Sequence, residues 1–244
     1  MPKSLRFRQL TKELNRLKKQ FLPRKFSEIN DYSERQLALT FAYRVFAHAE
    51  IESYLEDRVW DTVQTAKNIW DNQGKAGRVL LCVIAFSGQE MAAPPDTLTP
   101  LKGKKNLPED KLKITKKIDI AIRCFKSVID QNHGIKETNL LKLLLPIGID
   151  SDDLDKVWLL NMDTFGEERG EIAHSSGIKI KTQQPPNPAD ELERVKQIIQ
   201  ELERVDQRKC WFQSWFWDNQ WSKSASFSKS SRASPKSSNC STDN

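Results

Sequence analysis

The chain has 244 residues, of which 38% are hydrophobic and 30% charged, and its formal net charge is +6. This composition supports one substantial core and excludes a short stapled peptide, a collagen-like chain and a low-complexity chain. The longest apolar run, residues 79–86, is far shorter than the roughly 20 residues that cross a bilayer, and no apolar signal segment opens the chain. We therefore expect a soluble, cytoplasmic protein with no membrane partner.

The four cysteines are far apart in the sequence, without a Cys-x-x-Cys spacing and without a histidine nearby. This pattern does not fit a zinc site, so we expect neither a metal nor another cofactor. Cys82 and Cys124 lie in apolar stretches and are predicted to be small buried hydrophobic residues.

The first 25 residues hold most of the surplus positive charge. Apolar residues at three- and four-residue spacing, beginning at Leu5 or Phe7 and continuing to Phe21, predict an amphipathic helix that Pro23 ends. Its other face is basic, and such a stripe attracts phosphate backbones, although a merely solvated helix face has the same composition. The candidate RNA-binding residues on this face are Arg6, Arg8, Lys12, Arg16 and Lys19.

Helical periodicity continues through the rest of the chain, and no stretch alternates long enough to build a sheet. An apolar segment at 78–86 is followed by a long Pro- and Lys-rich loop, 88–108, and Ser151 is expected to cap the helix that follows it. Residues 178–188 fit either a short strand or a loop. The predicted helices are 33–70 (one long helix or two), 112–129, 137–145, 152–174 and 189–207. We therefore predict an all-α helical bundle.

The composition changes abruptly after this bundle. We predict a helical domain over 1–208, an aromatic-rich segment over 209–222 and a disordered Ser- and Lys-rich tail over 223–244. The aromatic side chains suit three arrangements: stacking on bases, insertion into a membrane surface, or packing back onto the body.

Three histidines are the candidates for proton transfer near neutral pH. His48 is either a second acid–base group or an ordinary helix residue paired with Glu52, and His133 fits a turn that ends a helix. His174 lies near the predicted end of a helix, where the helix dipole favours the protonated imidazole.

Arg169 precedes His174 by five residues, which places the two side chains about 140° apart on one continuous helix. One shared site then needs either a helix that loosens before Ser175 or a second subunit that completes the site across a two-fold axis. In a plainer interpretation, His174 pairs with Glu171 and caps the helix, while Arg169 pairs with a neighbouring glutamate.

The stretch Arg169-Gly-Glu-Ile-Ala-His174 resembles the Arg-x(4–6)-His signature of the HEPN superfamily of all-helical ribonucleases and RNA-binding domains. Residues 49–55 resemble the helix in which HEPN proteins of the RiboL-PSP and MAE_28990-like kinds carry an acidic residue in an apolar setting. Glu52 is the match to that residue, and Glu50 is the second choice.

This resemblance implies a bundle that dimerises through the motif helices and cleaves RNA without a metal, by attack of the ribose 2′-OH on the adjacent phosphate. Arg169 would then hold the phosphate, His174 would act as general acid or base, and Glu52 would orient one of them or tune its charge. It also implies a toxin or defence effector, with RNA, a second copy of the chain and an antitoxin or operon partner as its partners. The family often has a polar residue after the arginine, where this chain has Gly170, so the alternative is a non-catalytic module that binds RNA or a protein.

Overall fold

The computed structural model describes residues 3–89, 97, 109–174 and 186–227, with side chains left out at 110–111, 172–174 and 208–227. Within these ranges every regular element is helical, which confirms the predicted all-α class. Most of the Pro- and Lys-rich loop and most of the 223–244 tail lie outside the described residues. The helices are α1 (Leu5–Phe21), α2 (Glu34–Gln73), α3 (Arg78–Ala85), α4 (Glu109–Leu112), α5 (Ile114–Asp130), α6 (Glu137–Leu144), α7 (Lys156–His174) and α9 (Pro188–Phe227), with 3-10 turns η1 (Leu145–Ile147) and η2 (Ser151–Asp153).

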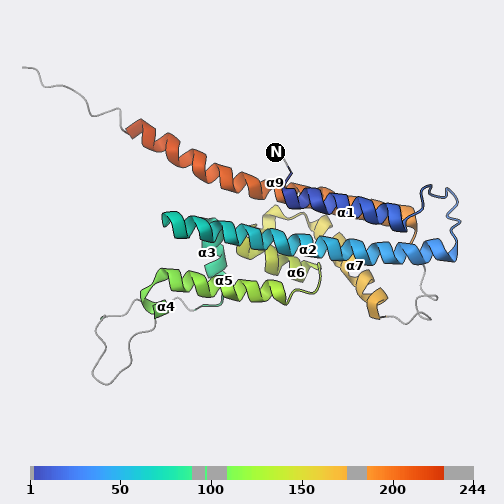
Figure 1. The fold of residues 1–244 in the computed structure, drawn as a ribbon, viewed down its shortest axis with the longest axis horizontal. Helices are drawn as coiled ribbons and strands as arrows, with labels where there is room; N and C mark the ends of the chain where they lie inside the picture. Colours follow the sequence, from blue (N-terminus) through green and yellow to red (C-terminus); the bar gives the residue numbers. More distant parts are fainter. Residues whose placement is uncertain (1–2, 90–96, 98–108, 175–185, 228–244) are drawn as a thin grey trace, which may run out of the picture.

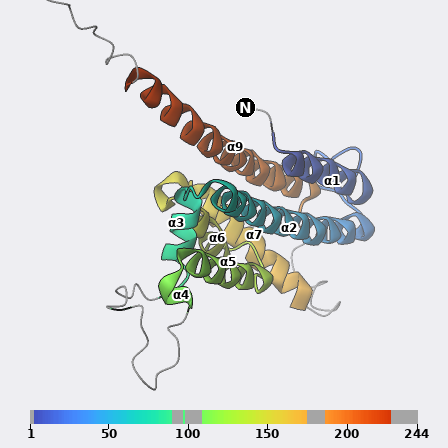
Figure 2. The same ribbon diagram turned by 60° about the vertical axis from the view of Figure 1, so that its left-hand side comes forward.

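Helix α2 is the central element of the bundle. Figures 1 and 2 show α1 and α9 on one side of it and α3, α5, α6 and α7 on the other. It is a single helix of 40 residues, and its start is specified by a capping box in which Ser33 and Gln36 bond each other's backbone N–H groups. Gly74 ends it in the left-handed conformation, at a φ of 65°, which glycine adopts at little cost.

Helix α1 packs its apolar stripe against α2, as its periodicity predicted. Its N-terminus is capped by Ser4, whose hydroxyl accepts a hydrogen bond from the N–H of Phe7 at 3.1 Å. The buried positions follow helical spacing and comprise Phe7, Leu10, Leu14 and Leu17. The basic side chains consequently remain on the outer faces of this helix.

The start of α7 differs from the prediction. Ser151 does not cap it; Ser151–Asp153 forms a 3-10 turn, and Leu154 then takes an extended conformation that accompanies the burial of its side chain. The cap is Asp155, whose carboxylate accepts a hydrogen bond from the N–H of Trp158 at 2.8 Å. Burial of Leu154 thus delays the helix to Lys156.

Helix α9 is longer than the predicted 189–207. Its backbone remains helical to Phe227 and includes the aromatic-rich segment 209–222. The side chains of that segment lie outside the described residues, so the three interpretations of the aromatic cluster stay predictions.

The expected burial of the cysteines is wrong for Cys124. Its side chain is exposed on α5, and Cys82 is half-buried on α3, both as free thiols. The reason is the helical period: the buried stripe of α5 passes through Phe125 and Ile129, and Cys124 lies outside it.

A buried carboxylate ties α1, α2 and α9 together. Asp206 is 2% exposed; its carboxylate accepts hydrogen bonds from Nε of Arg58 at 2.7 Å and from the N–H of Ser4 at 3.2 Å. Burial alone would raise the pKa of Asp206, but attraction and hydrogen bonding from Arg58, with the bonds from Ser4, outweigh it and hold the pKa below its ordinary value.

Replacing Asp206 with asparagine is expected to lower the free energy of unfolding at pH 7 by about 1.5–3 kcal/mol, because a charged hydrogen-bond acceptor is lost. Since the folded-state pKa is depressed, this contribution is complete above the unfolded pKa of about 3.9 and disappears as the pH falls through the folded value. Urea unfolding of both proteins between pH 7 and pH 3 measures it. A stability difference that does not shrink in acid would contradict this assignment.

Candidate functional site

Two pairs of side chains at i, i+4 spacing face each other between α2 and α7. His48 and Glu52 lie one turn apart on α2, and Phe165 and Arg169 lie one turn apart on α7. The ring of His48 stacks on that of Phe165 at 5.9 Å between centroids, and the positive charge of Arg169 acts on both His48 and Glu52. The fold therefore brings together Arg169 and Glu52, two of the three predicted catalytic residues.

Arg169 has no ion-pair partner among the residues that the structure describes, and its buried Nε atom has no hydrogen-bond partner. The adjacent glutamates bind other cations: Glu167 pairs with Lys136 at 3.1 Å, and Glu168 pairs with Arg44 at 2.8 Å and with Arg194. The plainer interpretation, in which a neighbouring glutamate neutralises Arg169, is thus not found. A guanidinium with unused donors is suited to a carboxylate or phosphate ligand.

Glu52 is the acidic residue of this site, and its side chain is 16% exposed. Burial raises its pKa, and repulsion from Glu56 adds to this rise, while the positive charges of Arg169 and His133 oppose it. The net effect is a raised pKa, so Glu52 takes up a proton more readily than a free glutamate does. The second choice, Glu50, acts instead on Arg16 of α1.

His48 is 1% exposed and uncharged at neutral pH. Its Nδ1 lies 3.5 Å from a carboxylate oxygen of Glu52 but makes no hydrogen bond. Burial, with repulsion from Arg169, lowers the pKa of His48 to about 4. His48 is therefore not the charged partner of Glu52.

Replacing His48 with glutamine is expected to flatten the pH dependence of stability between pH 6.5 and pH 4. In that window the unfolded histidine binds a proton that the folded one excludes, so the wild type loses up to about 1.4 kcal/mol per pH unit as the pH falls. Urea unfolding at pH 7, 6 and 5 measures the slope in both proteins. Equal slopes would show that His48 titrates normally in the folded protein.

The loop between α5 and α6 contributes a group that the sequence did not reveal. Nδ2 of Asn132 donates to Glu56 at 2.7 Å and to the carbonyl of Gly134 at 3.0 Å, which attaches the loop to α2. His133 follows, exposed to solvent and close enough to lower the pKa of Glu52. The sequence suggested only a turn residue because docking of this loop onto α2 is a tertiary contact.

His174 is the last residue of α7, and its side chain lies outside the described part of the structure. Among the residues with described side chains, no cluster of histidine, cysteine and acidic groups is arranged to hold a metal ion. Within the described ranges, no helix has an apolar stretch long enough for a bilayer.

The five predicted RNA-binding residues lie on α1, and they differ in their contacts. Arg6 donates to Asp57 of α2 at 2.7 Å, and Arg16 donates to Glu13 at 2.6 Å. Arg8, Lys12 and Lys19 are exposed and have no ion-pair partner among the described residues. These three form the part of the basic face that remains open to an anionic ligand.

The family model of RiboL-PSP-HEPN proteins matches residues 5–207 of the chain. The chain therefore belongs to the RiboL-PSP-HEPN family, a group of HEPN-type domains, and the matched region spans α1 through the described side chains of α9. No curated protein and no solved structure matches it.

Proposed function

We propose that this protein is a metal-independent endoribonuclease of HEPN type, with Arg169, His174 and Glu52 as its catalytic residues. The observation that supports the proposal most is the guanidinium of Arg169, which has no ion-pair partner among the described residues and whose positive charge acts on Glu52, a carboxyl group with a raised pKa. A guanidinium that is already paired with a buried carboxylate would have to give up that partner, or share its donors with it, to bind a phosphate. Membership of a HEPN family supports an RNA-related role.

In this mechanism the 2′-OH of a ribose attacks the adjacent phosphate. A general base accepts the 2′-OH proton, a general acid protonates the leaving 5′ oxygen, and the products are a 2′,3′-cyclic phosphate and a 5′-OH end. Arg169 binds the phosphate oxygens and stabilises the charge that builds up on them. His174 transfers a proton, and the raised pKa of Glu52 suits it to orient a partner or to tune that partner's charge.

We further propose that two copies of the chain complete the site. Because the backbone of α7 stays helical through His174, positions 169 and 174 lie about 140° apart around the helix axis within one subunit. A two-fold axis beside α7 would bring the histidine of each copy toward the arginine of the other.

Gly170 offers a test of this dimer. A Cβ atom at Gly170 would meet no atom within 4 Å among the described residues, so a lone chain should gain about 1 kcal/mol from Gly170→Ala through helix propensity. If a second copy packs against Gly170, the variant should instead form a weaker dimer in sedimentation measurements. A stabilised monomer with unchanged association would argue against packing at this glycine.

RNA would be held by the open basic face of α1. Arg8, Lys12 and Lys19 recur at intervals of four and seven residues, which places them along one stripe of the helix. The ion pairs of Arg6 and Arg16 involve partly exposed groups that contribute little stability, so both arginines can exchange their carboxylates for phosphates. Affinity for RNA should then fall steeply with salt.

The deciding assay is incubation of the protein with mixed RNAs in EDTA, followed by analysis of the product ends for cyclic phosphate. Wild-type protein should cleave, and His174→Ala should not, while Lys156→Met, which removes an exposed charge at the far end of α7, should cleave normally. A toxin or defence effector should also stop growth when expressed, unless its antitoxin or operon partner is present. RNA cleavage that survives in His174→Ala would contradict the assigned chemistry.

The second candidate is a non-catalytic HEPN module that binds RNA or a protein, and Gly170 in place of a polar residue favours it. RNA binding without cleavage, lost in Lys12→Glu but kept in His174→Ala, would identify this function.

A further inference from the structure

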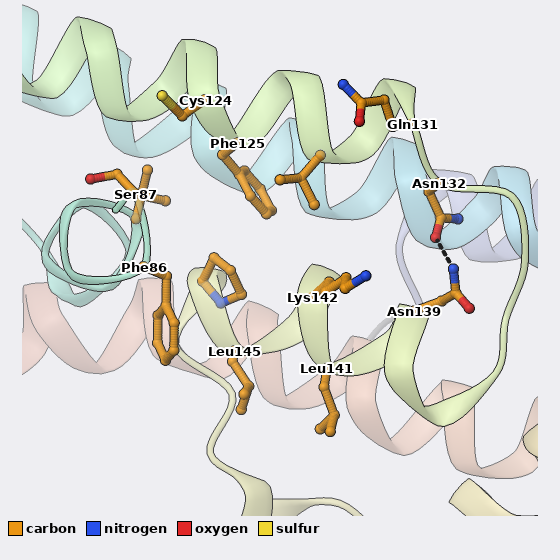
Figure 3. Close-up of a pocket in the computed structure, with 13 residues that line it drawn as sticks. Phe86, Ser87, Cys124, Phe125, Gln131, Asn132, Asn139, Leu141, Lys142 and Leu145 are labelled. Atoms are coloured by element: carbon orange, nitrogen blue, oxygen red, sulfur yellow. Dashed lines mark hydrogen bonds between the residues drawn. The ribbon is translucent and has the colours of Figure 1, made fainter. Parts of the chain in front are cut away.

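A cavity of about 490 Å³ lies outside the cluster around Arg169, between α3, α5, α6 and η1. Figure 3 shows α5 on one side, α6 and η1 on the other, and α3 closing one end. Its volume falls in the range of sites for small organic ligands, about 300–1,000 Å³. The lining residues that the argument uses are Phe86, Phe125, Val128, Asn132, Asn139 and Lys142.

The walls of this cavity are apolar and partly aromatic. Phe125 contributes a buried ring from α5, whereas Phe86, at the end of α3, is 58% exposed. Val128 is also partly exposed, at 39%. An aromatic ring and aliphatic side chains left open to solvent on two sides of a slot suit a flat, apolar ligand.

One end of the cavity is polar. Nδ2 of Asn139 donates to Oδ1 of Asn132 at 2.9 Å, as the dashed line in Figure 3 shows. Oδ1 of Asn139 lies toward Gly134, whereas the second hydrogen on Nδ2 has no acceptor among the described residues and is the group that remains for a ligand. Lys142 is exposed, without a carboxylate partner among those residues. The ligand should therefore combine a flat body with hydrogen-bonding groups and a negative charge.

Asn132 connects this cavity to the candidate site. It lines the cavity and also donates to Glu56, which is one helical turn beyond Glu52 on α2. The amide end of the cavity is thus joined by one hydrogen bond to Glu56, a carboxylate that in turn repels Glu52.

We infer that this cavity holds one unstacked nucleotide of the RNA substrate, with the base between Phe86 and Val128, its edge at Asn139 and its phosphate at Lys142. This inference rests on the proposed function, which supplies the RNA. Single-stranded RNA is generally recognised through splayed bases that stack on aromatic side chains and bond to polar groups along their edges. An alkyl ligand would leave the amide and the lysine unused.

Binding is tested by NMR on the full chain, with nucleoside monophosphates, ribose 5-phosphate and octanoate as probes. Nucleotides should shift the signals of Val128 and Asn139, and the other two probes should not. Val128→Trp, which fills the cavity, should abolish these shifts, and Lys142→Met should weaken binding about tenfold. Lys156→Met is the matched control because that lysine is exposed but remote from the cavity lining.

The same variants are then assayed with a non-cleavable 2′-O-methyl RNA and with cleavable RNA. Weaker RNA binding by Val128→Trp, at unchanged thermal stability, supports the subsite. Wild-type cleavage with no loss in Val128→Trp overturns the subsite and leaves the proposed function standing. If nucleotides shift the NMR signals but the protein cleaves no RNA, the proposed nuclease activity is rejected and the nucleotide subsite is supported. Equal shifts from octanoate and nucleotides identify a general apolar slot and overturn the inference.

Discussion

Replacing Arg169 with alanine is expected to slow RNA cleavage by about 10²–10³-fold, the usual cost of removing a donor that stabilises transition-state charge. Stability should not fall, because the described residues include no ion-pair partner for this guanidinium and its Nε is buried without a hydrogen bond. Cleavage rates in EDTA and urea unfolding of the same preparations measure the two effects. Loss of activity without loss of stability is the result expected for a functional residue whose buried donor has no partner in the folded protein.

Arg169→Lys is the matched control for charge. It keeps the positive charge but loses the planar fork that binds a phosphate through two hydrogen bonds, so we expect an intermediate rate. A structural role would give the opposite pattern, with Arg169→Ala unfolding at lower urea and activity falling only in proportion to the folded fraction. That result would remove Arg169 from the catalytic residues.

Replacing Arg44 with alanine is expected to lower the free energy of unfolding by about 3–5 kcal/mol. Arg44 is 7% exposed, and its guanidinium binds both carboxylate oxygens of Glu191, which is 2% exposed, and also Glu168 at 2.8 Å. Its loss leaves the charge of Glu191 buried without compensation, which costs more than the ion pair itself contributes. Chemical denaturation at pH 7 measures the change.

The double variant Arg44→Met, Glu191→Leu separates these two effects. It removes both charges and keeps apolar volume, so its stability should lie within about 1–2 kcal/mol of the wild type. Arg16→Ala, at an exposed pair, should change stability by less than about 1 kcal/mol. A double variant as unstable as Arg44→Ala would contradict the buried-charge explanation.

Glu168 connects Arg44 to the part of α7 that carries Arg169. Arg44 and Arg194 both bind this carboxylate, which precedes Arg169 directly in α7. The two ion pairs hold the turn of α7 that carries Arg169 against α2 and α9. Partially destabilised Arg44 variants should therefore also lose more RNA cleavage than their folded fraction explains.

Much of this architecture follows from local pattern. Apolar spacing predicted α1 with a start at Leu5 or Phe7 and an end after Phe21, and the absence of Gly and Pro over 33–70 predicted one long helix or two, of which the structure has one, α2. A short motif marked Arg169, and a second stretch marked Glu52. The helix predictions succeed because helix formation and amphipathicity depend on neighbours within a few turns, whereas the roles of Arg169 and Glu52 stay predictions. The start of α7 was wrong because burial of Leu154 overrode the local capping signal of Ser151.

Contacts between distant segments decided the rest. Pairing with Glu168 and Glu191 occupies Arg44, whereas Arg169 stays unpaired within the described residues, and the local sequence does not show which of the two arginines is paired. Docking of Asn132 onto Glu56, 76 residues away, brings His133 near Glu52, and burial between α2 and α7 makes His48 neutral. Periodicity assigns a side chain to a helix face, but its charge state and its partners depend on which other helices pack against that face.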